Sequence, residues 1–169
     1  MYEPQEDSFL LLKHIRHYSH GHVLDMGTGS GILAIEAAKK ASKVIAADID
    51  NDAIAHLKKK IHNKKITFIV SDLFSNIKDK FDLIIFNPPY LPSTNVKHID
   101  LDGGRNGTEI IERFLKQSKK HLKDNGKILL LCSSLNKDIE KLFKKHDYRY
   151  NKIDEAPLFF EKLFVWELY

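Results

Sequence analysis

The chain has 169 residues, of which 43% are hydrophobic; this suits one domain with a sizeable core and leaves no room for a second domain of ordinary size. The net charge of +4 is only mildly basic, so the lysine runs at positions 58–60 and 64–65 fit a solvated face better than a nucleic-acid contact. A single cysteine, Cys132, excludes an internal disulfide framework, and the sequence shows neither a secretory leader nor a membrane-length apolar run, which predicts a cytoplasmic protein.

Apolar residues recur along the chain in two alternating rhythms. A helical spacing predicts helices over residues 6–17, 31–41, 52–62, 108–122 and 136–144. Short apolar runs between them predict strands over residues 23–26, 43–48, 66–70, 82–86 and 127–132. This alternation is typical of βαβ units, so the sequence predicts an α/β fold with a largely parallel sheet.

The last third of the chain carries several turn and cap signals. Asn125-Gly126 is expected to end the helix before it, and Asn136 is expected to cap the short helix that follows. Two β-rich stretches, residues 148–154 and 159–168, are separated by Pro157. Because they are adjacent and joined by a short turn, we expect a C-terminal antiparallel hairpin.

The tetrapeptide Asn87-Pro88-Pro89-Tyr90 follows a buried strand, where α/β enzymes place their chemistry. Two consecutive prolines remove two backbone donors, so the carbonyls here are free to accept hydrogen bonds from a ligand. Together with the side-chain oxygen of Asn87 and the ring of Tyr90, they predict a pocket for a planar amino group. The alternative is a rigid strand exit with Tyr90 packed in the core.

A glycine-rich segment, Asp25-Met26-Gly27-Thr28-Gly29-Ser30-Gly31, joins the first predicted strand to a helix. Its glycines do not follow the dinucleotide-binding spacing, because position 32 is isoleucine. Asp25 would repel a pyrophosphate but attract a cationic ammonium, such as the one in S-adenosylmethionine. The alternative is a tight turn without a ligand.

Two further acids follow predicted strands. Asp48 ends the second strand, at about the 20-residue distance from a glycine loop that is typical of an acid binding ribose hydroxyls. Asp72 lies just past the third strand and can reach the same crevice, or else serves as a turn or capping residue. The cluster His14, His17, His20 and His22 is a poor zinc site, since Gly21 interrupts its geometry.

In this order, the glycine segment, Asp48, Asp72 and Asn87-Pro88-Pro89-Tyr90 resemble the class I S-adenosylmethionine-dependent methyltransferases that act on planar amino groups. Residues 2–9 and 102–107 resemble the HemK-related protein-glutamine methyltransferases in particular. The resemblance covers essentially the whole chain. The N-terminal helical domain of the bacterial members is absent, so the match is to the short archaeal and eukaryotic enzymes, which methylate the glutamine of a Gly-Gly-Gln motif in class 1 translation termination factors.

The resemblance implies one Rossmann-like domain over residues 1–169, with helices on both sheet faces and residues 1–20 closing the cofactor pocket. It implies that the methyl donor is S-adenosylmethionine, without a metal, with Asp25 and the glycines at the methionyl part, Asp48 at the ribose and Asp72 at the adenine. The implied catalytic residues are Asn87, Pro88, Pro89 and Tyr90. The implied cofactor-binding residues are Asp7, Ser8, Asp25, Gly27, Thr28, Gly29, Gly31, Asp48, Ile49, Asp72, Leu73 and Asn87.

Some of these assignments have alternatives. Asp7 and Ser8, with Glu6, either close the pocket or simply cap the first helix. Residues 103–107, with Arg105, either shape the acceptor side or form a glycine-permitted turn with a surface ion pair. For the whole protein, the rivals are a methyltransferase of adenine or another nucleic-acid amino group, disfavoured because no target-recognition domain is present, and a binding module without catalysis.

A partner is also implied. In the usual methyltransferase strand order, the strand at residues 66–70 forms a sheet edge, and its apolar residues give that edge little protection. An added strand from another protein would cover it. The short relatives depend on a small zinc-binding activator, so we expect this edge, Ile66–Val70, to dock one.

Overall fold

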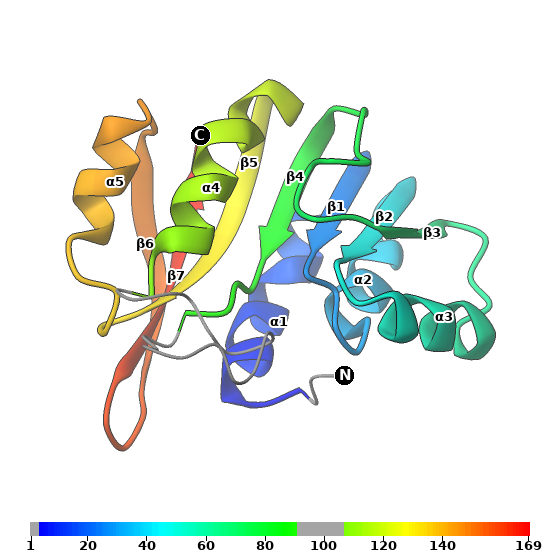
Figure 1. Ribbon diagram of the computed structural model, residues 1–169, viewed down its shortest axis with the longest axis horizontal. Coiled ribbons are helices and arrows are strands. Elements are labelled where there is room, and N and C mark those ends of the chain that lie inside the picture. Colours follow the sequence, from blue (N-terminus) through cyan, green and yellow to red (C-terminus); the bar gives the residue numbers. More distant parts are fainter. Residues whose placement is uncertain (1–3, 91–106) are drawn as a thin grey trace.

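A computed structural model describes residues 4–90 and 107–169 of the chain. Its strands are β1 (His22–Met26), β2 (Lys43–Asp48), β3 (Ile66–Val70), β4 (Phe81–Phe86), β5 (Leu122–Ser133), β6 (Tyr150–Pro157) and β7 (Lys162–Leu168). They form one sheet in the order β3-β2-β1-β4-β5-β7-β6 (Figure 1). The first five strands run parallel, while β7 is antiparallel to both β5 and β6. The predicted parallel sheet, C-terminal hairpin and edge position of β3 are confirmed.

Helices cover both faces of this sheet. They are α1 (Glu6–Tyr18), α2 (Ile32–Ala38), α3 (Asn51–Lys60), α4 (Glu109–Ser118) and α5 (Ile139–Lys145), with a 3-10 turn at Lys119–His121. The apolar sides of α1, α2 and α3 pack in one core cluster, and those of α4 and α5 in another on the opposite face. Leu24 and Ile84 of the central strands are fully buried, as expected for parallel strands covered on both sides.

The predicted role of Asn125-Gly126 is wrong. Helix α4 ends at Ser118, and both residues lie inside β5, where the pairing with β4 is irregular. Asn125 has a φ of 63°, and a Cβ on Gly126 would stand 2.7 Å from the carbonyl oxygen of Phe81. The turn signal therefore marks a close approach of two strands rather than a helix end.

Two predicted boundaries near the C-terminus also shift. Helix α5 begins at Ile139 with Asp138 at its N-cap, so Asn136 does not cap it. Pro157 ends β6 instead of separating the strands, and the turn comprises residues 158–161. Phe159 and Phe160, which were predicted to lie in a strand, are therefore on the turn. None of the helices in the described ranges is long and apolar enough to cross a membrane.

Candidate active site

The glycine loop and the tetrapeptide Asn87-Pro88-Pro89-Tyr90 leave neighbouring strands at the same level. Strands β1 and β4 are paired with Met26 opposite Phe86, so the two loops begin side by side at the carboxyl edge of the sheet. Gly27 has a φ of 64°, and a Cβ there would point at the Phe86 ring and the Asn87 carbonyl, at 3.5 and 3.9 Å. Glycine thus keeps the space between the loops open.

Asp25 lies under the glycine loop and is fully buried. Its Oδ2 accepts a hydrogen bond of 2.6 Å from Thr28 Oγ1, while its Oδ1 has no hydrogen-bond partner among the described residues. Burial raises the pKa of Asp25 to about 7, although the Thr28 hydroxyl and the nearby Ala34 amide oppose that rise, and the charge of Asp48 adds a small further increase. A buried carboxylate with an open oxygen favours a cationic ligand.

Asp48 holds the other side of the same loop. Its Oδ2 accepts from the Gly29 amide at 2.8 Å, and its Oδ1 accepts from the Asp50 amide at 3.0 Å. Each carboxylate oxygen has a second lone pair, so Asp48 can still accept from ligand hydroxyls. The neighbouring Ile49 is 55% exposed and offers an apolar surface beside that carboxylate.

Asp72 is more exposed than the other acids and is paired. Arg113 of α4 donates to its Oδ2 at 2.8 Å, and both side chains are nearly half exposed. Leu73 beside it is buried with a φ of 46°, a conformation that is costly for a branched side chain. No local pattern predicts Arg113 as a partner of Asp72, since this pairing depends on how α4 packs against the loop after β3.

Asn87 is fixed by the start of α1. Its Nδ2 donates to Asp7 Oδ2 at 3.0 Å and lies 3.5 Å from Ser8 Oγ, and both partners are buried. Gln5 occupies the N-cap of α1 and makes no side-chain cap bond. Asp7 Oδ1 accepts from the Ser8 amide at 2.5 Å, so Asp7 satisfies a donor of the first turn as well as holding Asn87. The carboxylate selects the amide orientation, because the flipped amide would place two oxygens together. Asn87 Oδ1 is then left buried with no hydrogen-bond partner in the described part of the chain.

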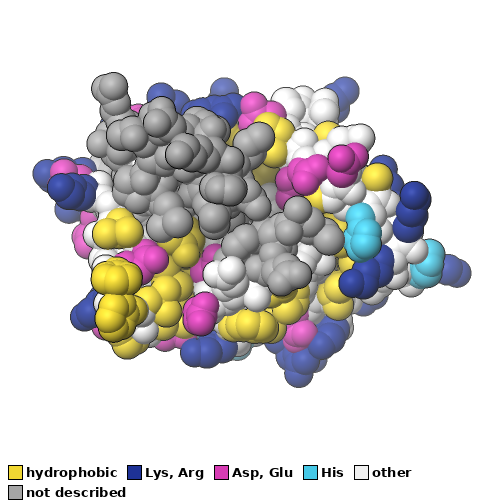
Figure 2. All heavy atoms as spheres, turned by 60° about the horizontal axis from the view of Figure 1, so that its bottom comes forward, with side chains coloured by type: hydrophobic (Ala, Val, Ile, Leu, Met, Phe, Trp, Pro, Cys, Tyr) yellow, Lys and Arg dark blue, Asp and Glu magenta, His cyan; other side chains and the backbone are white. Residues whose placement is uncertain are grey.

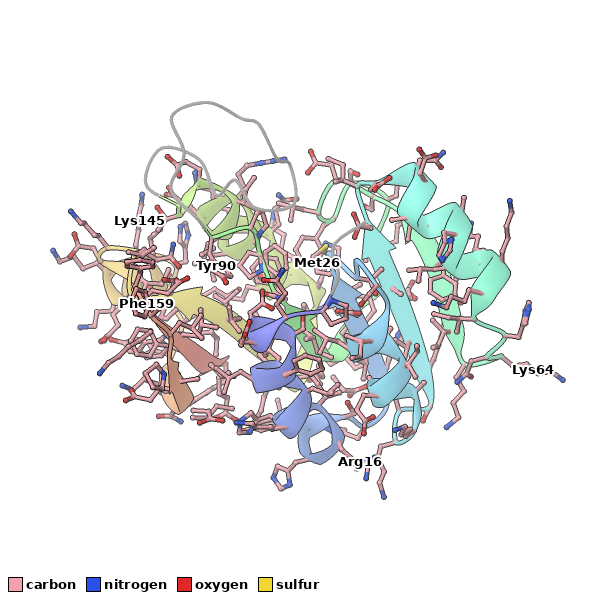
Figure 3. The ribbon with its side chains drawn as sticks, turned by 90° about the horizontal axis from the view of Figure 1, so that it is seen from below. Arg16, Met26, Lys64, Tyr90, Lys145 and Phe159 are labelled. Carbon is pink, nitrogen blue, oxygen red and sulfur yellow. The ribbon has the colours of Figure 1, made fainter. Side chains whose placement is uncertain are left out.

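Pro88, Pro89 and Tyr90 follow Asn87 in the same loop. Pro88 is buried, whereas Pro89 and Tyr90 are partly exposed. Tyr90 packs against the core cluster that contains the inner face of α1. Its pKa is raised by burial and by the negative charges of Asp7, Glu161 and Glu6. Tyr90 is therefore a neutral aromatic surface in a negative local field. Figure 3 looks onto this edge of the sheet and labels Tyr90.

Asn136 is a site residue that sequence reasoning missed. It is buried, and its Nδ2 donates to the carbonyl oxygens of Tyr90 and Gly107, both at 2.8 Å. Its Oδ1 accepts from the Ser133 amide at 2.8 Å, which ties it to the end of β5. Asn136 thus fastens Tyr90 and the residue before α4 to the sheet. Residues 2–3 and 102–106, Arg105 included, lie outside the described residues.

Residues 4–156 match the model of the family described as "Methyltransferase small domain". The chain belongs to this family. Accordingly, the protein is a methyltransferase, and S-adenosylmethionine is the methyl donor that its motifs predict. The site fits that cofactor: the open oxygen of Asp25 suits its ammonium, Asp48 suits its ribose, and Gly27 leaves room between the loops.

Two relatives that are similar to this chain are named as glutamine methyltransferases. A Methanocaldococcus jannaschii protein named "Putative protein N5-glutamine methyltransferase MJ0928" is 42% identical over 153 residues, which cover 85% of this chain and 78% of that protein. A release factor glutamine methyltransferase of Streptococcus pneumoniae is 32% identical over 140 residues, or 73% of this chain and 50% of that protein. The chain thus aligns with about half of the bacterial relative's length.

A solved structure shares the fold. It is the E. cuniculi Mtq2-Trm112 complex, which is responsible for the methylation of the eRF1 translation termination factor. The TM-score is 0.81 at 24% identity, with 99% of this chain and 96% of that chain covered. At this identity the likeness supports the Rossmann-like methyltransferase fold and no finer assignment.

The raised pKa of Asp25 predicts how cofactor binding depends on pH. Below about pH 7 the carboxyl group is neutral and loses its attraction for an ammonium group. We expect the affinity for S-adenosylmethionine to fall about tenfold from about pH 7.5 to about pH 5.5, by calorimetry. Asp25→Asn should bind weakly at both pH values, and an equal pH dependence in this variant would contradict the assignment.

Asn136→Ala should remove the hydrogen bond that attaches the Tyr90 carbonyl to the sheet and leave the glycine loop unchanged. Because two carbonyls lose their donor, we expect a stability loss of about 1–3 kcal/mol in chemical denaturation. The rate of methyl transfer should fall at least about tenfold at a saturating cofactor concentration, which corresponds to about 1.4 kcal/mol. The affinity for S-adenosylmethionine should stay within about threefold of the unmodified protein. Lys137→Ala, at the exposed neighbouring position, is the control. If Asn136→Ala loses cofactor affinity together with activity, Asn136 has a general structural role instead.

Proposed function

We propose that this methyltransferase acts on the side-chain amide nitrogen of glutamine, in the Gly-Gly-Gln motif of a class 1 peptide chain release factor. The observation that carries the proposal is Asn87 Oδ1, a buried acceptor without a partner in the described residues, beside the glycine loop. A primary carboxamide supplies the N–H donors that such an acceptor lacks. The names of the M. jannaschii and S. pneumoniae relatives support glutamine as the methylated residue.

Methyl transfer to an amide nitrogen depends mainly on how that nitrogen is positioned. Bound S-adenosylmethionine supplies an activated methyl group on a sulfonium. An amide nitrogen is a poor nucleophile because its lone pair is delocalised, so holding it in line with that methyl is the main contribution of the protein. Asn87 Oδ1 and the Pro88 carbonyl would each accept a hydrogen bond from one N–H group of the substrate amide, and the Tyr90 ring would pack against the flat amide. The nitrogen would gain the methyl as the methyl–sulfur bond breaks, its electron pair staying on sulfur as a neutral thioether, and the N-methylated amide cation would lose its extra proton to water.

The second candidate acceptor is an exocyclic amino group of adenine or another base in DNA or RNA. Such a base also presents a planar NH2 group, so the pocket alone does not separate the two. The charges around it do favour a protein. Among the described residues, the side chains that act electrostatically on Tyr90 are the carboxylates of Asp7, Glu161 and Glu6, whereas a nucleic acid would bring phosphates to the same place.

The test of this function uses labelled S-adenosylmethionine with a termination factor, a variant factor whose motif glutamine is replaced by alanine, and RNA or DNA. We expect label only on the unmodified factor. Asn87→Ala should abolish transfer and leave the affinity for cofactor within about threefold. Asn151→Ala, an exposed asparagine on β6, should leave both unchanged. Label on nucleic acid alone would overturn the choice of acceptor, and equal loss of transfer and cofactor binding would make Asn87 structural.

We further propose that a small activator protein adds a strand to β3. This strand ends the sheet, and Thr67 on it is exposed while Ile69 and Val70 are only partly buried. The Lys65 carbonyl and the Ser71 amide bond to β2, so by alternation the amides of Phe68 and Val70 face the open edge. The complex formed by the Mtq2 relative supports a small partner.

Hydrogen exchange at β3 tests this docking. The amides of Phe68 and Val70 should exchange quickly in the isolated protein and at least about tenfold more slowly after co-purification with the activator. The amides of Thr67 and Ile69, which face β2, should be protected in both samples. If the isolated protein is soluble, monomeric and fully active, or if β3 exchange is unchanged in the complex, the proposed activator interaction is refuted.

A further inference from the structure

The turn between β6 and β7 exposes two adjacent aromatic rings. Phe159 is 91% exposed and Phe160 is 86% exposed, far more than any other large hydrophobic side chain in the described residues. Their ring centroids lie 4.5 Å apart in an edge-to-face arrangement. Leu135, 38% exposed, follows the end of β5 next to this turn. Contiguous exposed apolar side chains are a feature of interaction sites, whereas single scattered ones are ordinary.

The turn is firmly attached to the sheet. The Leu158 amide donates to the Glu161 carbonyl at 2.7 Å, and Leu158 packs against the core. Ser134 and Lys162 are joined twice, by a 2.8 Å bond between their backbones and a 2.9 Å bond from the Lys162 amide to Ser134 Oγ. Ser133 Oγ also donates to Glu161. The two phenylalanines therefore lie on a projecting turn whose position is fixed by hydrogen bonds to the end of β5.

The projection stands beside the proposed acceptor pocket. Figure 1 shows the β6–β7 turn extending from the same edge of the sheet as the loops after β1 and β4. Figure 3 labels Phe159 and Tyr90 on that edge. Ser133, which binds Glu161 through its hydroxyl, also donates its amide to Asn136, and Asn136 binds the Tyr90 carbonyl. A protein whose loop enters the proposed acceptor pocket can therefore contact the aromatic turn with a neighbouring part of its surface.

The local charge indicates what kind of molecule this is. The chain has a net charge of +4, yet Glu161 on the turn and Glu6 and Asp7 on α1 all place negative charge around Tyr90. Figure 2 shows hydrophobic side chains gathered at the lower left, with acidic side chains between them and Lys or Arg side chains at their margin. A surface that is apolar and acidic complements a partner that is apolar and basic.

We propose that Phe159 and Phe160 dock the folded protein acceptor, on an apolar patch with basic residues that flanks its methylated glutamine loop. This inference rests on the proposed function and specifies how the acceptor is held. The aromatic pair supplies affinity for the folded acceptor, while the pocket at Asn87 supplies the chemistry. Loss of the pair should therefore affect the KM for a folded acceptor and leave the kcat unchanged.

The test compares two acceptors, the folded termination factor and a short peptide carrying only the glutamine motif. The double variant Phe159→Ala, Phe160→Ala, purified with the activator, should raise the KM for the factor at least about tenfold. Its kcat, its KM for S-adenosylmethionine and its KM for the peptide should stay within about twofold. Tyr169→Ala is the matched control, since it removes an aromatic ring that is 42% exposed at the opposite end of β7. This control should leave every constant unchanged.

The possible failures are distinguishable. If the unmodified enzyme methylates the factor and the double variant has the same KM for it, the docking role is refuted and the proposed function stands. A lower kcat for both acceptors would show that the turn supports the pocket structurally, which also refutes docking. Loss of self-association in the double variant, with an unchanged KM, would assign the aromatic pair to contacts between copies of the chain. If the unmodified enzyme does not label the factor, both proposals are wrong.

Discussion

The hydrogen bond from Asn87 to Asp7 is the contact on which the proposed chemistry depends. Asp7 belongs to the first turn of α1 and Asn87 to the loop after β4, so the bond closes the pocket between segments that are distant in the sequence. It fixes the amide orientation and thereby leaves the Asn87 oxygen, the atom proposed to bind the acceptor, without a partner in the described residues. An isolated carboxamide on a loop would rotate freely, and only the packing of α1 prevents this.

The same pocket also depends on the sheet. Because β1 and β4 are neighbours in register, the loop that suits the cofactor and the loop that suits the acceptor start from adjacent strands. Asp25 and Asn87 then each present one buried oxygen that has no partner within the described residues. Buried polar atoms of this kind are costly unless a ligand satisfies them. Four other buried side-chain atoms of the described residues also lack a partner, so it is the position of Asp25 and Asn87, in and after the paired strands β1 and β4, that makes them the candidates for the place where two substrates would meet.

Much of this arrangement follows from local sequence rules. The βαβ rhythm, the glycine loop, Asp48 and the strand exit at Asn87 each depend on residues close together in the chain, so patterns predict them. The role of Asn136 is different, because it depends on a loop more than 40 residues earlier that only the folded sheet brings near. Asn125-Gly126 carried an ordinary turn signal, but the tight contact with Phe81 decides its place in β5. Likewise, nothing local showed that Phe159 and Phe160 would project from a turn.

The central claim, that Asn87 presents a carboxamide nitrogen to the methyl donor, is tested most directly by locating the methyl group. A termination factor incubated with the enzyme, its activator and S-adenosylmethionine would be digested and sequenced by tandem mass spectrometry. The account predicts one added methyl group on the side-chain nitrogen of the Gly-Gly-Gln glutamine. A methyl group on any other residue, or on a carboxylate or ring nitrogen, would contradict it.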